Sequence, residues 1–426
     1  MTGIFGSGVG LVAEVISQMT DPTGADPFTA TADGARHAVY DSLTAKGPVH
    51  RILTPAGGYG WLVTGHEAAK AALTDPRIVK GSTGHSAYTE LLPADVADAI
   101  NHHLLALNPP DHSRLRRLVS AAFTRRRSEL LGPRIQEITD DLLAGLSHEA
   151  DGAGAAVAEP IDLLADFAYP LPITVICELL GIPDADRGRF RGWTGPVMLG
   201  HLVGPEVYVP AVTELVVYLR ELIAGKRLDP ADDLLSALID VRDQGDRLTE
   251  DELTSMVFLL LIAGHETTVN LIANGVRALL GNPRQLAALR AMPDLMDAAV
   301  EELLRFDGPL QSAIPASTAE DVELAGVRIP AGEVVIISLL AANRDGRHYP
   351  DADRLDLFRA DSSHLAFGCG VHHCLGAPLA RLEARIALTG LISRFPGLRL
   401  AVPEEKLNRL PGLLMNALAE LPVYLA

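Results

Sequence analysis

The feature that most constrains the fold of this chain is one long apolar segment, residues 249–280, which the sequence predicts as a single helix. Thr249 and Glu252 have the spacing of a capping box at its start, and Gly281 followed by Pro283 predicts its end. About thirty residues with a rise of 1.5 Å each span roughly 45 Å, close to the full width of a protein of this size. We therefore expect the helix to cross the interior, with the rest of the chain packed around it.

The middle of this helix carries polar side chains where packing alone would favour apolar ones. The apolar run 256–262 is followed by Ala263-Gly264-His265-Glu266-Thr267-Thr268. Ala263 and Thr267 are one turn apart and so share a face of the helix. A threonine hydroxyl that bonds to a preceding carbonyl group bends a helix and makes room for water. For this segment alone, a pair of buried threonines satisfied within the helix is the simpler interpretation.

Short β-type runs flank the helical part of the chain. Residues 48–53 and 59–64 predict a hairpin, residues 321–329 a second turn near Ala325-Gly326, and residues 333–340 a further strand. From about residue 67 to residue 310 the pattern is helical, with breaks at Gly and Pro. The sequence thus predicts a mainly α fold with small β-sheets, of the α+β class. No low-complexity linker divides residues 1–426, so we expect a single domain.

Composition excludes several classes of partner. The formal net charge of −18 argues against nucleic acid or an anionic membrane as the main partner. Residues 1–20 lack a positively charged start followed by a long apolar run, so we expect neither a secretory signal nor a membrane anchor. The cysteines Cys177, Cys369 and Cys374 make no disulfide framework and fit a reducing cytosol. We therefore expect a cytoplasmic protein.

A loop near the C-terminus presents a thiol among closely spaced glycines. It reads Phe367-Gly368-Cys369-Gly370-Val371-His372-His373-Cys374-Leu375-Gly376-Ala377-Pro378. Glycine at 368, 370 and 376 lets the backbone approach a large flat ligand and permits positive φ. Cys374 comes just before a predicted helix with Pro378 in its first turn, where free N–H groups favour a thiolate, and a buried thiolate favours a metal.

Two other interpretations of this loop remain open on the residues alone. An isolated cysteine in a core is usually inert. Zinc is also possible, because Cys369, His372, His373 and Cys374 are all potential ligands. A structural zinc site, however, commonly uses two separated pairs of ligands, and the chain has no second Cys/His pair at suitable spacing.

The loop resembles the haem-binding signature of the cytochrome P-450 family, F-x-x-G-x-H-x-C-x-G, at all the fixed positions: Phe367, Gly370, His372, Cys374 and Gly376. The resemblance implies a cytochrome P-450 fold with haem b (iron protoporphyrin IX) between the long central helix and this loop. It also implies that the Cys374 thiolate is the axial iron ligand, that Phe367 packs beside the sulfur, and that His372 hydrogen-bonds a haem propionate.

The long helix also resembles the family, which has A/G-G-x-D/E-T-T at this place. Ala263 and Gly264 are then expected to lie against the haem, with Gly264 leaving room for the macrocycle and O2. The resemblance assigns Thr267 to hydrogen-bonding the oxygen co-substrate and Glu266 to passing protons inward.

A third segment resembles the H-x-x-x-R propionate clamp of the family. His112 and Arg116 are one turn apart and are expected to face the haem, while Arg114 and Arg117 point away. Six arginines form a basic island: Arg114, Arg116, Arg117, Arg125, Arg126 and Arg127. The island is either an ordinary solvated helix face or a docking patch for an acidic protein.

The chain departs from the family at one position that contacts the cofactor. The family commonly carries a further propionate-binding Arg where this chain has Ala316. Haem anchoring is therefore expected to depend more on His112, Arg116 and His372, or on another Arg.

The pair Glu302 and Arg305 forms an E-x-x-R motif, which by itself is a common surface ion pair. In the family this pair is structural and is buried with an Arg from the segment before the haem loop. Arg354 best matches that Arg, and Arg359 is the possible substitute.

The resemblance implies a soluble bacterial haem-thiolate monooxygenase that inserts one atom of O2 into a C–H bond or a double bond of an apolar small molecule, polyketide, terpenoid or steroid-like. Electrons are expected from NAD(P)H through a reductase and a ferredoxin, because the chain has no flavin or nicotinamide fingerprint. Segments 80–105, 190–209, 256–267, 308–316 and 411–416 are expected to line the substrate pocket. A peroxide-driven haem-thiolate enzyme and a non-catalytic haem-binding sensor are the alternatives.

Overall fold

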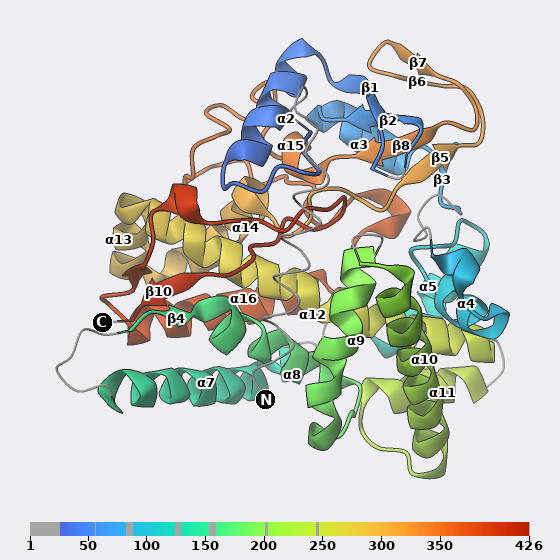
Figure 1. Cartoon of the computed structure of the whole chain (residues 1–426), viewed down its shortest axis with the longest axis horizontal. Coiled ribbons are helices and arrows are strands. Elements are labelled where there is room, and N and C mark those ends of the chain that lie inside the picture. Colours follow the sequence, from blue (N-terminus) through green and yellow to red (C-terminus); the bar gives the residue numbers. More distant parts are fainter. Residues whose placement is uncertain are drawn as a thin grey trace.

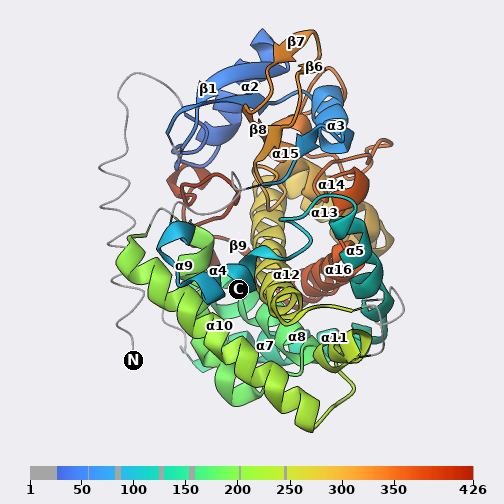
Figure 2. The same cartoon turned by 90° about the vertical axis from the view of Figure 1, so that its right-hand side faces the viewer.

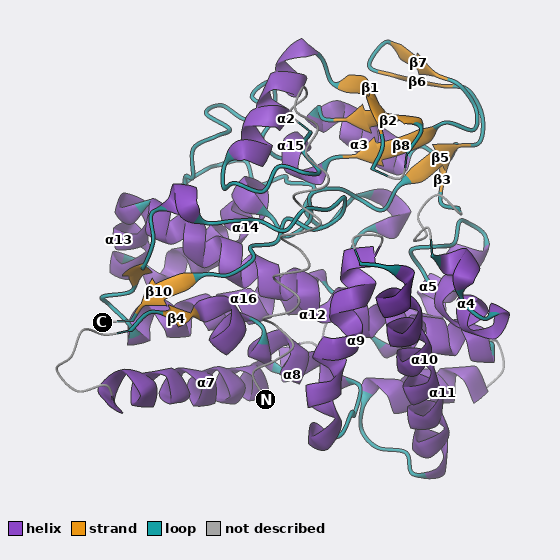
Figure 3. Ribbon diagram, viewed as in Figure 1, coloured by secondary structure: helices purple, strands orange, loops and turns teal. Residues whose placement is uncertain are grey.

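Helices dominate the architecture, and the strands form small sheets at its periphery (Figures 1 and 3). The computed structural model describes residues 26–55, 57–81, 88–123, 129–152, 159–200, 203–243 and 247–425. The prediction of a mainly α fold with small sheets is confirmed.

The helices of the described residues are, in chain order, α2 (Ala35–Lys46), α3 (His66–Thr74), α4 (Ala94–Asn101), α5 (Asp111–Ala122), α7 (Gly132–Gly152), α8 (Pro170–Leu179), α9 (Arg187–Leu199), α10 (Pro205–Leu228), α11 (Leu234–Asp243), α12 (Glu250–Gly281), α13 (Pro283–Ala291), α14 (Met296–Asp307), α15 (Leu339–Ala342) and α16 (Ala377–Arg394).

The strands are β1 (Val49–Leu53), β2 (Tyr59–Val63), β3 (Ile78–Val79), β4 (Ile161–Asp162), β5 (Ala316–Thr318), β6 (Val322–Leu324), β7 (Val327–Ile329), β8 (Val334–Ile337), β9 (Arg399–Leu400) and β10 (Pro422–Tyr424). They form a five-stranded sheet in the order β1-β2-β8-β5-β3, a three-stranded sheet in the order β4-β10-β9, and the β6-β7 hairpin. Both predicted hairpins, β1-β2 and β6-β7, are therefore present.

The long helix predicted from residue 249 is α12, and it runs through the middle of the molecule in both views (Figures 1 and 2). Thr249 and Glu252 form the expected capping box. The helix packs against α4, α8, α14 and α16, so its apolar side chains form the centre of the largest core cluster. It is long and apolar enough to span a membrane, but 67% of its most apolar window is buried inside the protein, as is typical of a core helix.

The five-stranded sheet supports the cysteine loop, which we define as residues 367–376. Val335 and Ile337 of β8 belong to the apolar core under this sheet, and Leu365 belongs to the same cluster. Cys369, inside the loop, packs against that cluster. The sheet therefore holds one flank of the loop in place.

The strand predicted over residues 333–340 is shorter than expected. It ends at Ile337 because Ser338 caps the short helix α15, its hydroxyl oxygen accepting a hydrogen bond from the Ala341 N–H at 3.1 Å. A side-chain cap offers the backbone an alternative to the sheet at this point.

Candidate functional site

The cysteine loop leads directly into α16. The Cys374 N–H donates to the Phe367 carbonyl oxygen at 2.9 Å and closes the loop. Gly368 and Gly370 have φ of 69° and 72°, where glycine is favoured. A Cβ on Gly370 would also lie 3.2 Å from the carbonyl oxygen of Leu73. Gly376, in contrast, has φ of −81°, so the expected need for positive φ does not apply to it.

Neighbouring groups have opposite effects on the pKa of the Cys374 thiol. The residue has exposed surface, yet the protein atoms around its sulfur bury it enough to raise the pKa of the thiol above its usual value. The N–H groups of Gly376 and Ala377 and the charge of Arg116 lower this pKa. The predicted effect of the helix start is therefore present, but burial outweighs it. A thiolate at this position needs a further cation, and a metal is one.

Two histidines, one in the loop and one beside it, have unpaired ring nitrogens. His112, in the first turn of α5, is 1% exposed and neither of its ring nitrogens has a hydrogen-bond partner. His372 Nδ1 is also without a partner, and the two ring centroids lie 4.3 Å apart. Buried polar atoms normally have partners, so a ligand is expected here. Within the described part of the chain no carboxylate contacts His112, His372 or Arg116, which makes an anion the fitting ligand.

Positive surroundings act on both histidines. The pKa of His372 is lowered to about 4, first by burial and then by His112 and Lys80. The pKa of His112 is lowered by burial and by Arg116. Burial and positive neighbours thus disfavour the charged form of each histidine, and a nearby anion would raise both pKa values.

On α12, the Thr267 hydroxyl donates to the Ala263 carbonyl oxygen at 2.8 Å, so these two residues share a face as predicted. Glu266 Oε1 lies 3.4 Å from Nε2 of the fully buried His265, a residue for which the sequence indicated no role. His265 Nδ1 donates to the Leu261 carbonyl oxygen at 2.7 Å. The polar cluster is therefore satisfied in part within the helix.

Gly264 packs closely against α8. A Cβ at this position would lie 3.0 Å from Cδ1 of Ile176, on α8, so the absence of a side chain favours the packing of α12 on α8. That Gly264 also leaves room for a flat ligand stays a prediction.

The E-x-x-R pair is buried, and a different arginine completes it. Arg305 donates to both carboxylate oxygens of Glu302, at 2.7 and 2.8 Å. Arg359 Nε lies 3.3 Å from Glu302 Oε1, whereas Arg354 is 62% exposed and pairs with Asp356 at 2.6 Å. The prediction of Arg354 as the third member is wrong. Its backbone carbonyl, not its side chain, meets Arg305, and so its side chain points outward.

Hydrogen bonds connect this ion pair to the cysteine loop through Asn343. Arg305 Nη1 donates to the Asn343 carbonyl oxygen at 2.9 Å, and Asn343 Oδ1 accepts from the Leu365 N–H at 2.6 Å. The Gly368 N–H in turn donates to the Leu365 carbonyl oxygen at 2.8 Å. Glu302 and Arg305 therefore position the loop, and Asn343 is a positioning residue that sequence reasoning missed.

Arg381 of α16 is a second residue that was missed. Its guanidinium lies 4.5 Å from the centroid of the Phe367 ring, and it donates to the two carboxylate oxygens of Glu301 at 2.6 and 2.8 Å. Its charge also lowers the pKa of Cys374. The signal that could have identified Arg381 is its position two helical turns beyond Cys374.

The basic island is only partly visible. Arg114 is engaged with Glu252 of α12 and donates to the Arg247 carbonyl oxygen at 3.0 Å, so it does not simply point outward as expected. Arg125, Arg126 and Arg127 lie outside the described residues.

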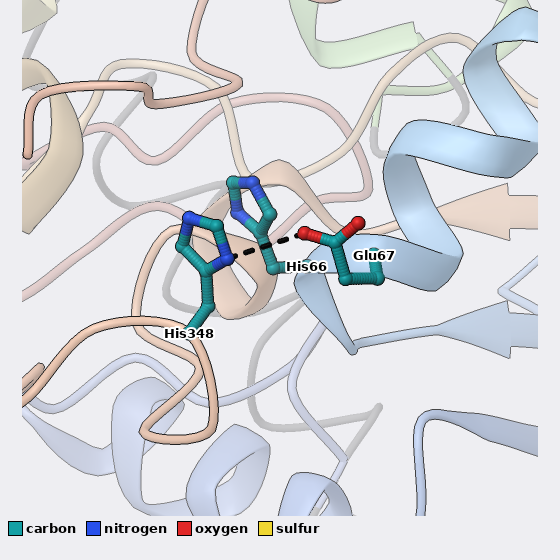
Figure 4. A group of neighbouring side chains, drawn as sticks. All are labelled: His66, Glu67 and His348. Carbon is teal, nitrogen blue, oxygen red and sulfur yellow. Dashed lines mark ion pairs between the residues drawn. The ribbon is translucent and has the colours of Figure 1, made fainter.

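A separate group of possible metal ligands consists of His66, Glu67 and His348 (Figure 4). His348 Nδ1 lies 3.2 Å from Glu67 Oε1, and His348 Nε2 lies 3.5 Å from Asp361 Oδ2. The two imidazole rings are stacked, with centroids 3.6 Å apart and 14° between their planes. The lone pairs of nearly parallel rings cannot converge on one ion. We interpret this group as a stacked ion pair that joins α3 to the segment after α15.

Comparison with known proteins gives the class of this fold and site. The family model of cytochrome P-450 matches residues 217–419. The cytochrome P-450 monooxygenase PikC of Streptomyces venezuelae is 47% identical over 91% of this chain and 90% of its own length. The mycinamicin IV hydroxylase/epoxidase of Micromonospora griseorubida is 45% identical over 90% of this chain and 94% of its own length.

Among solved structures, the tirandamycin C-bound monooxygenase TamI superposes with a TM-score of 0.82 at 41% identity, over 93% of this chain and 98% of that one. The fold and the thiol-bearing loop thus define an oxidoreductase that binds haem through sulfur. The chain belongs to the cytochrome P-450 family, and it is a monooxygenase as its named relatives are.

The residues of the site fit the haem that this family implies. The Cys374 thiol, as a thiolate, is a suitable ligand for the haem iron. The two propionates of a haem are carboxylates, and the unpaired nitrogens of His112 and His372 are suitable donors for them. The donor set therefore matches both the metal and the acidic edge of the cofactor.

Proposed function

We propose that this protein inserts one atom of O2 into a C–H bond or a double bond of an apolar small molecule, at a haem b held by Cys374. The observation that carries the proposal is the Cys374 thiol at the start of α16, with the unpaired nitrogens of His112 and His372 beside it. When bound, the haem supplies the activation of O2, which its thiolate ligand promotes. The protein binds and orients the substrate and delivers protons.

The residues around the cofactor have separate roles in this proposal. Cys374 holds the iron, and Phe367 covers the sulfur. Gly368, Gly370 and Gly376 shape the loop, and Ala263 lies on the face of α12 that meets the haem. The propionates accept hydrogen bonds from His112, Arg116 and His372. The Glu302–Arg305 pair supports the loop from behind.

Proton delivery is assigned to α12. The Thr267 hydroxyl oxygen keeps lone pairs free to accept from water while its proton bonds to the Ala263 carbonyl. The Glu266 side chain is 19% exposed, so it can exchange protons with solvent. We propose that Glu266 passes protons toward Thr267.

The proposed substrate is a polyketide or a comparable apolar natural product. Support comes from the relatives, since one is named for acting on mycinamicin IV and one structure is bound to tirandamycin C. We propose that electrons come from NAD(P)H through a reductase and a ferredoxin. We also propose that residues 1–426 act as one domain in the cytoplasm, where the described free cysteines Cys177, Cys369 and Cys374 would stay reduced.

The test is spectroscopic first and chemical second. The purified protein is reduced and exposed to carbon monoxide, and a strongly red-shifted Soret band is expected. Cys374→Ser should abolish this band, while Cys369→Ser, which changes the other thiol of the loop, should keep it. Absence of the band in the native protein refutes the proposal.

Macrolides and other polyketides are then screened for displacement of the haem water. A compound that displaces the water is incubated with the protein, NADPH, a ferredoxin and its reductase, and the mass of the product is measured by mass spectrometry. A gain of one oxygen atom supports the proposal. Turnover with hydrogen peroxide but none with the ferredoxin system would contradict the proposed electron supply.

A further inference from the structure

Lys80 lies directly across a strand pair from Ala316. The antiparallel pair β3-β5 aligns Ile78 with Thr318 and Val79 with Ser317. The next step of this register places Lys80, just beyond the end of β3, opposite Ala316. Directly opposed residues point to the same face of a sheet, with Cβ atoms about 4.5–5.5 Å apart. A side chain from Lys80 can therefore reach the space that a long side chain at 316 would occupy.

Hydrogen bonds hold the Lys80 backbone beside the start of α5. The Lys80 N–H donates to Asn108 Oδ1 at 2.8 Å, and Asn108 Nδ2 donates to the Lys80 carbonyl oxygen at 2.7 Å. The Asn108 carbonyl oxygen accepts from the His112 N–H at 2.9 Å. Asn108 thus fixes the distance between Lys80 and the buried His112.

The Lys80 ammonium is partly buried and incompletely paired. Its Nζ donates to the Ile314 carbonyl oxygen at 2.7 Å, and no carboxylate contacts it within the residues that the structure describes. Burial lowers the pKa of Lys80 to about 8. An ammonium has three N–H donors, so donors remain for another acceptor. A cation in such a place is costly without an anion.

Asn108 and the ring contact of the two histidines connect Lys80 to the cysteine loop. Asn108 bonds to the Lys80 backbone and to the His112 N–H, and the His112 ring centroid lies 4.3 Å from that of His372. Lys80, His112 and His372 thus come from three separate segments that are linked by direct contacts.

We propose that Lys80 binds a haem propionate from across the β3-β5 pair and replaces the arginine that this chain lacks at Ala316. This inference rests on the proposed function, because it requires a bound haem. The interaction is a charge-assisted hydrogen bond between Nζ and a propionate oxygen, which Nζ makes beside its bond to Ile314. No covalent step is involved.

The test compares haem retention among variants of the haem-loaded protein. Release of haem is followed by its transfer to excess apomyoglobin, and the reduction potential is measured in parallel. Lys80→Met should release haem about tenfold faster, as expected for loss of a charged hydrogen bond, and should lower the reduction potential because a positive charge is removed. Lys80→Arg keeps the cation and should remain close to the native protein in both measurements. Lys70→Met, at an exposed lysine of α3, is the matched control and should change neither.

A second-site variant separates propionate binding from a purely structural role. Adding Ala316→Arg to Lys80→Met restores a cation from the opposite strand and should bring haem release back toward the native rate. Unchanged haem release and potential in Lys80→Met would overturn the inference. The inference would also be overturned if Lys80→Met and Lys80→Arg released haem faster to the same extent while the reduction potential of Lys80→Met stayed at the native value. That result would point to loss of the Ile314 bond alone. If the native protein shows no red-shifted carbon monoxide band, the proposed function itself fails instead.

Discussion

The Thr267 hydroxyl donates a hydrogen bond to the carbonyl oxygen of Ala263, 2.8 Å away and one turn earlier on α12. The Ala263 carbonyl oxygen therefore accepts a hydrogen bond from a side chain of its own helix, and such bonds often bend a helix. It also fixes the hydroxyl on the face of α12 that we assign to the cofactor.

Thr267→Ala is therefore expected to uncouple electron consumption from product formation. Without the hydroxyl, proton delivery at this face is lost, so product per NADPH should fall by about tenfold while hydrogen peroxide accumulates. NADPH oxidation, product and peroxide are measured together. Thr213→Ala removes the same kind of bond, to the Val209 carbonyl oxygen on α10, and should leave coupling unchanged. Unchanged coupling in Thr267→Ala would contradict the proton-delivery role.

The two candidate arginines near Glu302 should differ sharply in their effect on stability. Arg359→Ala removes a partner of the buried Glu302 carboxylate and donors to three backbone carbonyls, so it should cost about 2 kcal/mol in the free energy of unfolding. Arg354→Ala removes only an exposed pair with Asp356 and should cost less than about 0.5 kcal/mol. Urea unfolding measures both. A larger loss for Arg354→Ala would reverse our assignment.

The Arg381–Glu301 pair predicts a pH-dependent contribution to stability. The pKa of Glu301 is about 2: burial alone would raise it, and Arg381 and His364 lower it more strongly. A lowered carboxyl pKa stabilises the fold above the unfolded value near 4.5, and this contribution is lost as the pH falls toward 2. Arg381→Gln should therefore cost roughly 1–2 kcal/mol at pH 7, and the difference from the native protein should shrink below about pH 4.5.

Urea unfolding at a series of pH values between 7 and 3 measures this difference. The matched control is Arg385→Gln, also on α16, whose Nε lies 3.6 Å from Oδ1 of the exposed Asp297. It should show a small effect at every pH. A difference for Arg381→Gln that stays constant down to pH 3 would mean that Glu301 does not titrate as described.

His112→Ala should weaken haem retention. Both ring nitrogens of His112 are buried without a partner, and a propionate would satisfy one of them. We expect about tenfold faster transfer of haem to apomyoglobin, since Ala316 offers no side chain to compensate. His50→Ala, on β1, removes a histidine whose Nε2 lies 2.8 Å from the Gly47 carbonyl oxygen, and it should not change the transfer. Full haem occupancy and a native rate in His112→Ala would refute the clamp.

Local patterns in the sequence were sufficient for several elements. The capping box of Thr249 and Glu252 and the breakers Gly281 and Pro283 gave the ends of α12 nearly to the residue. Turn residues placed the β1-β2 and β6-β7 hairpins in the same way. These features depend on residues close together in the chain, so they can be predicted from the sequence.

Contacts between distant segments were harder to predict. The spacing of residues did not show which of Arg354 and Arg359 turns inward, because the backbone between them curls so that the Arg354 carbonyl meets Arg305. In the same way, Gly264 proved to face Ile176, and Arg114 proved to engage Glu252. Each outcome depends on how one helix or loop lies on another.

The sequence alone predicted one long central helix, because spacing along a helix sets which side chains share a face, and its motifs resembled those of a haem-thiolate family. Only the folded protein decided which groups meet across the chain, such as Lys80 with Ile314 or Arg359 with Glu302. Those meetings arise from the packing of segments that are far apart in sequence, and packing is a property of the whole structure.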